Sequence, residues 1–448
     1  MAKPASALAP GAVGTVETRY LDLPEPVRLD CGRELHPVRV AYETYGTLSP
    51  RRDNVILVCH ALSGDAHAAG FAKTPPAEST RDGFGATDRD GPAGQGLGWW
   101  DGMIGPGKAF DTDRFFVVST NLLGGCGGTT GPSSVNPATG RPYGADFPVI
   151  TVADMIRTER AFLRELGIER LAAVAGGSLG GMQALEWAIL FPGQVDTVVA
   201  IASTHALQPQ GMAWNAIARE AIMRDPAWQG GHYYGTGAVP GAGLGVARMV
   251  GHVTYLSAQA LGDKFGRRLQ RPAGDGTPGT FPEAGLSPET ADGIRYTITE
   301  PEFEVESYLR HQGDSFVRRF DANTYLYTSR ALTYFDLARQ HGGSLTRALA
   351  GVAARTLLIA FSSDWLYPPS GSAEIADALR ALGKPAQLEV IDAPYGHDCF
   401  LLEEARQTPV IRQFLGPGPA TGQPATGQPA TGEPATGGPG VIAETDDL

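Results

Sequence analysis

The sequence lacks the features of a membrane-spanning, secreted or nucleic-acid-binding protein. No apolar stretch approaches the roughly 20 residues that a membrane span needs, and the N-terminus has no basic region followed by an apolar one. The net charge is −12 and no long basic cluster occurs, which argues against a nucleic-acid partner. These absences predict a soluble, cytoplasmic protein that binds neither membrane nor nucleic acid.

Cysteine is also scarce. The four cysteines are Cys31, Cys59, Cys126 and Cys399. Their wide spacing produces neither a CxxC zinc site nor an evident disulfide framework, so we expect no bound metal. Isolated cysteines of this kind fit a reducing compartment.

Four segments contain too few large apolar residues to build a core. Residues 416–440 repeat Pro-Ala-Thr-Gly with Gln or Glu, which predicts a disordered tail over residues 416–448. Residues 1–16 are rich in Ala, Gly and Pro, and we expect them to be loose. Residues 73–98 and 272–293 are expected to form surface loops without a chemical role.

Short apolar runs that alternate with helical patterns fill most of the remaining sequence. This alternation predicts one α/β domain built from two pieces of the chain, residues 17–202 and 344–415. Between them, residues 203–343 show helical periodicity with breaks rich in Gly and Pro, which predicts an inserted helical lid. Helices are expected in the lid over residues 212–224, 245–261, 302–314 and 322–335.

One apolar run ends abruptly in a glycine-flanked serine. Residues 171–175 read as a buried strand, residues 176–180 are Gly-Gly-Ser-Leu-Gly, and a helical pattern follows. A serine on such a tight strand-to-helix turn needs small residues two positions before and after it, which explains Gly176 and Gly180. The pattern predicts a nucleophile elbow with Ser178 as the nucleophile; a glycine-rich packing turn is the alternative.

A serine hydroxyl needs a base to take its proton and usually a carboxylate to orient that base. Asp364 follows the apolar run 356–361 and is the candidate orienting acid. His397 follows the run 387–392 and is the candidate base. The chain order Ser, Asp, His, with acid and base each after a late strand, is that of the α/β-hydrolase fold, a mostly parallel central sheet flanked by helices.

Two further histidines, His60 and His67, compete with His397 for the role of base. They lie in the loop that directly follows the apolar run 55–59, which is expected to be a strand. In an α/β-hydrolase this loop donates a backbone N–H to the oxyanion. We therefore expect the N–H groups of Leu62 and Leu179 to form the oxyanion hole.

The triad by itself indicates acyl transfer or hydrolysis and nothing finer, since this fold hosts many chemistries. An esterase or thioesterase would use water as the acceptor. A catalytically inactive scaffold that only binds partners would be expected to lack a triad member, and all three are present.

Several longer motifs extend beyond the triad. They are residues 60–67, 98–101, 104–107, 119–126, 130–137, 143–148, 176–183, 247–252, 257–266, 308–313 and 320–325. Together they make residues 17–415 closely resemble the homoserine O-acyltransferase family. The two apolar-poor segments and the repeat tail depart from the family pattern but leave these motifs intact.

The resemblance implies a double-displacement reaction of methionine biosynthesis. An acyl-CoA acylates Ser178, CoA leaves, and the hydroxyl of L-homoserine attacks the acyl-enzyme, with His397 serving as base and then acid. The family's binding residues carry over to Arg248 for the substrate carboxylate and Asp398 for its ammonium group. A solvated lid arginine is the alternative for Arg248. The resemblance also implies a homodimer formed through the lid and no cofactor besides the acyl-CoA co-substrate.

The acyl group is predicted from one position. A succinyl group ends in a carboxylate that needs a cation in the acyl pocket, whereas acetyl needs only a small apolar space. The resemblance implies that relatives which transfer succinyl have arginine at the place of residue 366, whereas this chain has Leu366. Leu366 therefore favours acetyl-CoA. Serine stays open as an alternative acceptor, because one methylene is worth only about 1–3 kcal/mol of discrimination.

Overall fold

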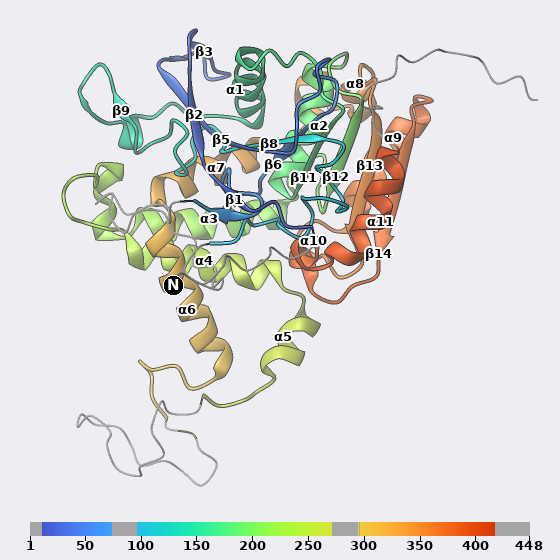
Figure 1. Cartoon of the computed structure of the whole chain (residues 1–448). Helices are drawn as coiled ribbons and strands as arrows, with labels where there is room; N and C mark the ends of the chain where they lie inside the picture. Colours follow the sequence, from blue (N-terminus) through green and yellow to red (C-terminus); the bar gives the residue numbers. More distant parts are fainter. Residues whose placement is uncertain (1–10, 74–95, 271–293, 295, 417–448) are drawn as a thin grey trace, which may run out of the picture.

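The computed structural model describes residues 11–73, 96–270, 294 and 296–416. Its centre is an eight-stranded sheet of order β14-β13-β12-β11-β6-β8-β5-β2 (Figure 1). In chain order the strands are β2 (Arg19–Leu23), β5 (Val38–Tyr45), β6 (Val55–Cys59), β8 (Phe116–Thr120), β11 (Ala173–Gly177), β12 (Thr197–Ile201), β13 (Arg355–Phe361) and β14 (Ala386–Ile391). The last six are mutually parallel, and β5 runs antiparallel to both β2 and β8. This is the α/β-hydrolase fold that the sequence predicts.

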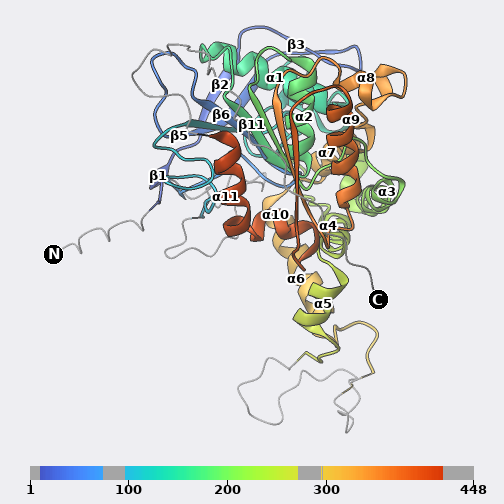
Figure 2. The ribbon, with the colours of Figure 1, turned by 90° about the vertical axis from the view of Figure 1, so that its right-hand side faces the viewer.

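The central strands are apolar throughout because both faces of the sheet are covered. In β6, Val55 and Leu57 face one core cluster, whereas Ile56 and Val58 face the other. Figure 2 shows α2 and α9 on one side of the sheet and α11 on the other. The helices outside the lid are α1 (Val152–Glu165), α2 (Leu179–Leu190), α8 (Leu345–Leu349), α9 (Pro369–Ala381), α10 (Cys399–Leu402) and α11 (Glu404–Leu415).

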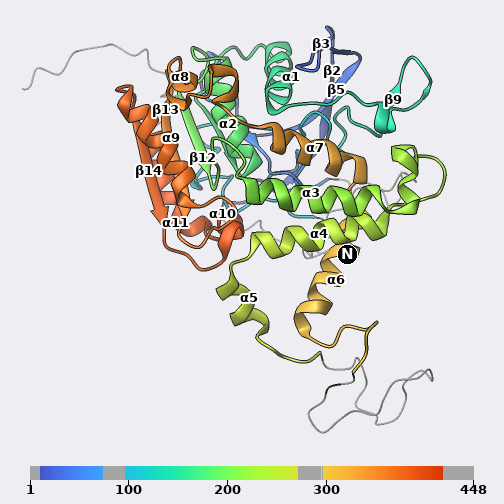
Figure 3. The same ribbon diagram turned by 180° about the vertical axis from the view of Figure 1, so that it is seen from behind.

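Among the described residues, the lid consists of five of the α-helices between β12 and β13 and precedes α8. They are α3 (Pro209–Met223), α4 (Gly241–Tyr255), α5 (Ala258–Phe265), α6 (Glu304–Arg319) and α7 (Ala322–Tyr334). Figure 3 shows α3 and α4 side by side next to α7, with α5 and α6 projecting away from the sheet. Helices α4 and α6 approach closely at Gly245 and Gly313, where a Cβ on Gly313 would lie 3.0 Å from the Gly245 carbonyl oxygen. The lid has a separate small core around Phe316.

The remaining elements are short. They are strands β1 (Thr15–Val16), β3 (Val27–Arg28), β4 (Glu34–Leu35), β7 (Phe71–Ala72), β9 (Val135–Asn136) and β10 (Arg141–Pro142), and 3₁₀ helices η1 (Gly144–Asp146), η2 (Pro226–Gly231), η3 (Arg339–His341) and η4 (Gly396–Asp398). Within the described ranges, no helix is long and apolar enough to cross a bilayer.

Two expectations differ from the structure. The expected helix 245–261 is two helices, because Ser257 caps α5 by accepting a hydrogen bond from the Ala260 N–H, and its hydroxyl donates to the Pro394 carbonyl. The segment 1–16 was expected to be loose, but its last two residues form strand β1. The Val16 carbonyl accepts a hydrogen bond from the Lys73 N–H at 2.8 Å.

The expected tail beyond residue 416 lies outside the described residues, as do residues 1–10 and most of the two expected surface loops.

Candidate active site

Ser178 occupies the turn between β11 and α2. Its backbone has φ 57° and ψ −122°, a region that residues other than glycine rarely adopt. A Cβ on Gly176 would lie 2.5 Å from the Gly180 backbone, and one on Gly180 would lie 2.1 Å from the Cys59 carbonyl oxygen. No larger residue fits at either position without moving β6, so the turn requires both glycines.

Three residues from distant parts of the sequence form one hydrogen-bonded chain. The Nε2 atom of His397 lies 2.8 Å from the Ser178 Oγ, and its Nδ1 atom lies 2.7 Å from the Asp364 Oδ2. The other Asp364 oxygen accepts the N–H groups of Leu366 and Tyr367 at 3.0 and 2.9 Å, which fixes the carboxylate. With a proton on Nδ1 held by Asp364, Nε2 is free to accept the serine proton.

Aromatic rings hold the imidazole in place. The Tyr367 ring meets His397 edge-on at 4.9 Å, and the Phe400 and Tyr255 rings lie 5.4 and 6.1 Å away. Tyr255 ends lid helix α4, so core and lid both shape the surroundings of the base. A Cβ on Gly396 would come within 2.5 Å of the Ser257 nitrogen, so the loop before His397 is also close to the lid.

The two competing histidines have other partners. His60 donates from Nδ1 to the Ala61 carbonyl at 2.6 Å and accepts the Leu122 N–H on Nε2 at 3.1 Å, so both ring nitrogens are occupied. Burial lowers the pKa of His60, which keeps the ring neutral. His67 lies 3.0 Å from the Glu43 carboxylate. Neither ring is hydrogen-bonded to Ser178.

Gln183 connects the two segments from which oxyanion donors are expected. Its side-chain amide donates to the carbonyls of His60 at 3.1 Å and Leu179 at 3.3 Å, and it is buried. Leu62 lines the same cavity as Ser178. The N–H of Leu179 belongs to the first turn of α2, whose donors have no intrahelical partner. Gln183 was not among the residues predicted from the sequence, although it and Glu186 are the two long polar side chains of an otherwise apolar helix.

Arg248 and Asp398 place opposite charges near the triad. The Arg248 guanidinium lies over the rings of Phe316 and Tyr255, 4.7 and 5.7 Å from their centroids. Its Nε is buried without a hydrogen-bond partner within the described part of the chain. Burial raises the pKa of the Asp398 carboxyl, and the charges of His397 and Arg248 oppose that rise. A half-buried guanidinium whose Nε is buried without a partner among the described residues suits an anionic ligand.

The space beside Ser178 is small. A cavity of about 40 Å³ touches Ser178, and Trp214, Leu366 and Tyr367 form part of its wall. These three residues also border a neighbouring cavity of about 370 Å³. Among the residues that the structure describes, neither cavity is lined by Lys or Arg.

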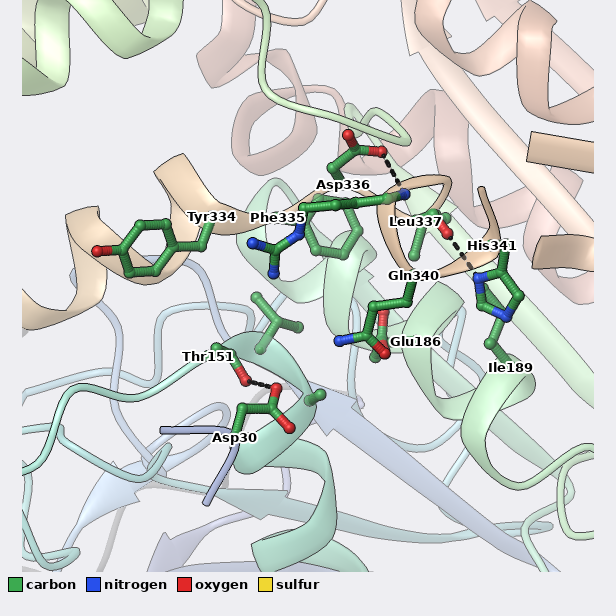
Figure 4. Close-up of a pocket in the computed structure, with 13 residues that line it drawn as sticks. Asp30, Thr151, Glu186, Ile189, Tyr334, Phe335, Asp336, Leu337, Gln340 and His341 are labelled. Carbon is green, nitrogen blue, oxygen red and sulfur yellow. Dashed lines mark hydrogen bonds between the residues drawn. The ribbon is translucent and has the colours of Figure 1, made fainter. Parts of the chain in front are cut away.

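Another hollow lies along the far part of α2 and contains no triad residue (Figure 4). Glu186 borders it, about 12 Å from Ser178 along the helix at 1.5 Å per residue. Burial raises the pKa of Glu186 to about 7. The Thr151 hydroxyl donates to Asp30 across the opposite wall. This hollow is separate from the Ser178 site.

Comparison with known proteins places this geometry in a family. Residues 54–404 match the family model described as the alpha/beta hydrolase fold. The homoserine O-succinyltransferase of Bordetella parapertussis is 48% identical over 421 residues, covering 92% of this chain and 93% of the relative. That of Pseudomonas putida KT2440 is 48% identical over 395 residues, covering 88% and 94%.

Two solved structures are similar over most of the chain. Homoserine O-acetyltransferase from Bacillus anthracis has a TM-score of 0.75 and 30% identity, covering 90% of this chain and 98% of that one. Esterase E22 has a TM-score of 0.74 and 30% identity, covering 90% and 100%. On the sequence match across nine-tenths of its length, the chain belongs to the homoserine O-acyltransferase family of α/β-hydrolase-fold proteins.

Proposed function

We propose that the protein transfers an acetyl group from acetyl-CoA to the hydroxyl of L-homoserine, releasing CoA and O-acetyl-L-homoserine for methionine biosynthesis. The observation that carries this proposal is the hydrogen-bonded chain of Ser178, His397 and Asp364 beside the opposite charges of Arg248 and Asp398. A serine nucleophile supplies the acyl transfer, and the paired charges match a zwitterionic amino acid.

In the first half-reaction, His397 takes the Ser178 proton as Oγ attacks the thioester carbonyl. The N–H groups of Leu62 and Leu179 stabilise the oxyanion, and the carbon–sulfur bond breaks as His397 returns the proton to the leaving sulfur. In the second half, His397 takes the proton of the homoserine hydroxyl, whose oxygen attacks the acetyl carbonyl. The ester bond to Ser178 then breaks, and His397 reprotonates the serine.

The amino-acid acceptor is held by the two charged residues. Arg248 binds the homoserine carboxylate and satisfies its buried Nε, and Asp398 binds the ammonium group next to the base. Neither contact is needed for the attack on the thioester. Serine is the alternative acceptor, because it differs by one methylene and offers the same two charges.

The acetyl donor is supported by the wall of the acyl cavity. Leu366 lies there, and the described residues around both adjoining cavities include no cation to meet a succinyl carboxylate. Succinyl-CoA is the alternative donor, since the 48% identical curated relatives are homoserine O-succinyltransferases.

A hydrolase is the alternative class, because esterase E22 resembles this chain as closely as the solved acetyltransferase does. The deciding assay measures CoA release from acetyl-CoA and from succinyl-CoA, each with homoserine, serine or no acceptor. We expect fast release only with acetyl-CoA and homoserine together. Equal release without acceptor supports the hydrolase and contradicts transfer, and faster release from succinyl-CoA overturns the acetyl assignment. A cytoplasmic homodimer stays a prediction.

A further inference from the structure

The buried amide of Gln183 lies between the two chain segments from which oxyanion donors are expected. One segment is the loop after β6, which contains His60 and Leu62, and the other is the first turn of α2, which begins at Leu179. A Cβ on Gly180 would lie 3.4 Å from the His60 carbonyl oxygen, so the two segments are in direct contact. The Gln183 side chain, which is 1% exposed, joins them at this contact.

The two segments each present an unused backbone donor near the nucleophile. Among the described residues, neither the Leu62 N–H nor the Leu179 N–H donates a hydrogen bond. Leu62 lines the cavity that contains Ser178, and Leu179 directly follows Ser178 in the chain. Because the two leucines belong to distant parts of the sequence, a contact across the fold must set the separation of their N–H groups.

Both hydrogens of the Gln183 amide are used in such a contact. The Nε2 atom lies 3.1 Å from the His60 carbonyl oxygen and 3.3 Å from the Leu179 carbonyl oxygen. Carbonyl oxygens only accept hydrogen bonds, so the nitrogen of the amide, and not its oxygen, must face them. One side chain therefore ties the loop after β6 to the first turn of α2 by two donated hydrogen bonds.

The two carbonyls that accept these bonds are close in sequence to the expected oxyanion donors. Leu179 supplies both a carbonyl and an N–H, and His60 precedes Leu62 by two residues. A shift of either carbonyl therefore moves the donor on the same short stretch of backbone. Such shifts matter for catalysis, because an oxyanion donor acts only at about 2.7–3.1 Å from the oxygen that it stabilises.

We propose that Gln183 is a positioning residue that holds the Leu62 and Leu179 N–H groups at the separation that the oxyanion requires. Gln183 does not line the Ser178 cavity, so it acts through the backbone of the two segments. The inference rests on the proposed function, in that it assumes that Ser178 attacks a carbonyl group. It does not depend on the acyl donor or the acceptor, because the attack on any ester or thioester produces an oxyanion.

Two substitutions at Gln183 separate its hydrogen bonds from its volume. Gln183→Met keeps the length of the side chain and removes both donors. Gln183→Glu keeps the shape, but an ionised carboxylate faces two carbonyl oxygens, and only the protonated carboxyl regains one donor.

Asn54→Leu is the matched control. Asn54 is also buried, and its amide also donates to two backbone carbonyls, those of Thr47 and Arg114 at 3.0 and 3.2 Å. It directly precedes β6, whereas His60 directly follows this strand, so Asn54 lies at the opposite edge of the sheet from Ser178. The control therefore loses a similar buried amide without touching either oxyanion segment.

The experiment measures acylation of Ser178 as the first burst of p-nitrophenol from p-nitrophenyl acetate and of CoA from acetyl-CoA. Gln183→Met should slow saturated acylation about ten- to a hundredfold with both donors, less than the roughly 10²–10³-fold cost of removing an oxyanion donor itself. The half-saturating donor concentration should stay unchanged, because the oxyanion forms only after binding. Asn54→Leu should lower the Tm without slowing acylation.

The pH dependence of Gln183→Glu distinguishes positioning from packing. Its acylation rate, divided by that of Gln183→Met, should rise as pH falls through the pKa of the introduced carboxyl, because protonation returns one donor to the carbonyls. Titration of His60 and His397 cancels from this ratio, since both variants retain both histidines. A side chain that only fills space gives a ratio that does not change with pH.

Three results overturn the inference: wild-type acylation by Gln183→Met, an equal slowing in Asn54→Leu, or a rate ratio of the two Gln183 variants that does not change with pH. Failure of the proposed function gives a different result. In that case the wild type shows no homoserine-dependent release of CoA from acetyl-CoA or succinyl-CoA, while the burst from p-nitrophenyl acetate still compares the Gln183 variants with wild type.

Discussion

The core and the lid contribute to the site in different ways. In the core, Ser178, Asp364 and His397 follow the carboxyl ends of three parallel strands, β11, β13 and β14, so the sheet itself brings them to one edge. In the lid, Arg248 lies within a helix, and its position depends on how α4 packs against α3 and α6. The core sets the chemistry, and the lid sets which molecules reach it.

This difference implies that substitutions in the two regions alter different steps. A change in the core triad should slow both half-reactions, because His397 serves in each of them. A change in the lid should affect only the step whose substrate it binds. The following variants test that separation.

Asp364→Asn should have the largest effect, a loss on the order of 10⁴ in kcat for both half-reactions, because an amide favours the wrong imidazole tautomer. Single-turnover acylation and discharge are measured separately. Asp392→Asn is the matched control, since Asp392 follows β14 but is exposed, and among the described residues its carboxylate accepts only the Ser362 hydroxyl. A loss below about tenfold in Asp364→Asn would contradict its assigned role.

Arg248→Ala should slow discharge of the acyl-enzyme by homoserine about 30-fold to several thousand-fold, because a sheltered charge-assisted contact costs about 2–5 kcal/mol to lose. Acylation by saturating acetyl-CoA should survive. The measurement is stopped-flow discharge of pre-formed acetyl-enzyme. If homoserine discharges variant and wild type equally fast, Arg248 is a solvated lid residue and the separation between regions fails at this point.

Leu366→Arg tests the acyl cavity. The added guanidinium would lie in the cavity wall and could meet a succinyl carboxylate, so kcat/KM for succinyl-CoA should rise relative to acetyl-CoA by about tenfold or more. Leu366→Met controls for the loss of leucine. An unchanged donor ratio in Leu366→Arg means that another position selects the acyl group.

Glu159→Gln affects stability and not catalysis. Burial raises the pKa of Glu159 to about 7 from 4.5, although Trp187 donates to its carboxylate at 2.7 Å. The folded state therefore keeps a proton that the unfolded state releases, and the free energy of unfolding falls as pH rises from about 4.5 to 7. That contribution is on the order of 3 kcal/mol.

Glu159→Gln has no carboxyl to ionise, so this fall in the free energy of unfolding with rising pH is absent from the variant. Its Tm relative to wild type should therefore be higher at pH 8.5 than at pH 5. Glu165→Gln, at the exposed end of α1, is the control and should show no such trend. A Tm difference that does not change with pH would mean that Glu159 stays ionised in the core.

The sequence was sufficient for the sheet and the elbow because both follow local rules. The apolar run 55–59 is strand β6 residue for residue, and the glycines around Ser178 are explained by contacts with that strand. The lid was less predictable. Ser257 interrupts the expected helix because a hydroxyl that can cap α5 also reaches the Pro394 carbonyl from the core. Periodicity carries no information about such a long-range contact.

The charged residues around the site show the same limit. Arg248 and Asp398 were assigned by resemblance, since nothing in their local sequence indicates that each is close enough to influence the other's charge. Gln183 was missed, because its importance depends on which carbonyls it reaches across the fold. Local patterns predict where a strand ends, but not which lid side chain lies above it.

The central claim is that Ser178 carries an acyl group that homoserine removes. The direct measurement is mass spectrometry of the protein incubated with acetyl-CoA, before and after homoserine is added, with Ser178→Ala alongside. We predict one added acetyl group on the peptide that carries Ser178, none in the variant, and its loss with formation of O-acetyl-L-homoserine. An acetyl group on a cysteine peptide, or an acetyl-enzyme that decays at the same rate with and without homoserine, would contradict the account.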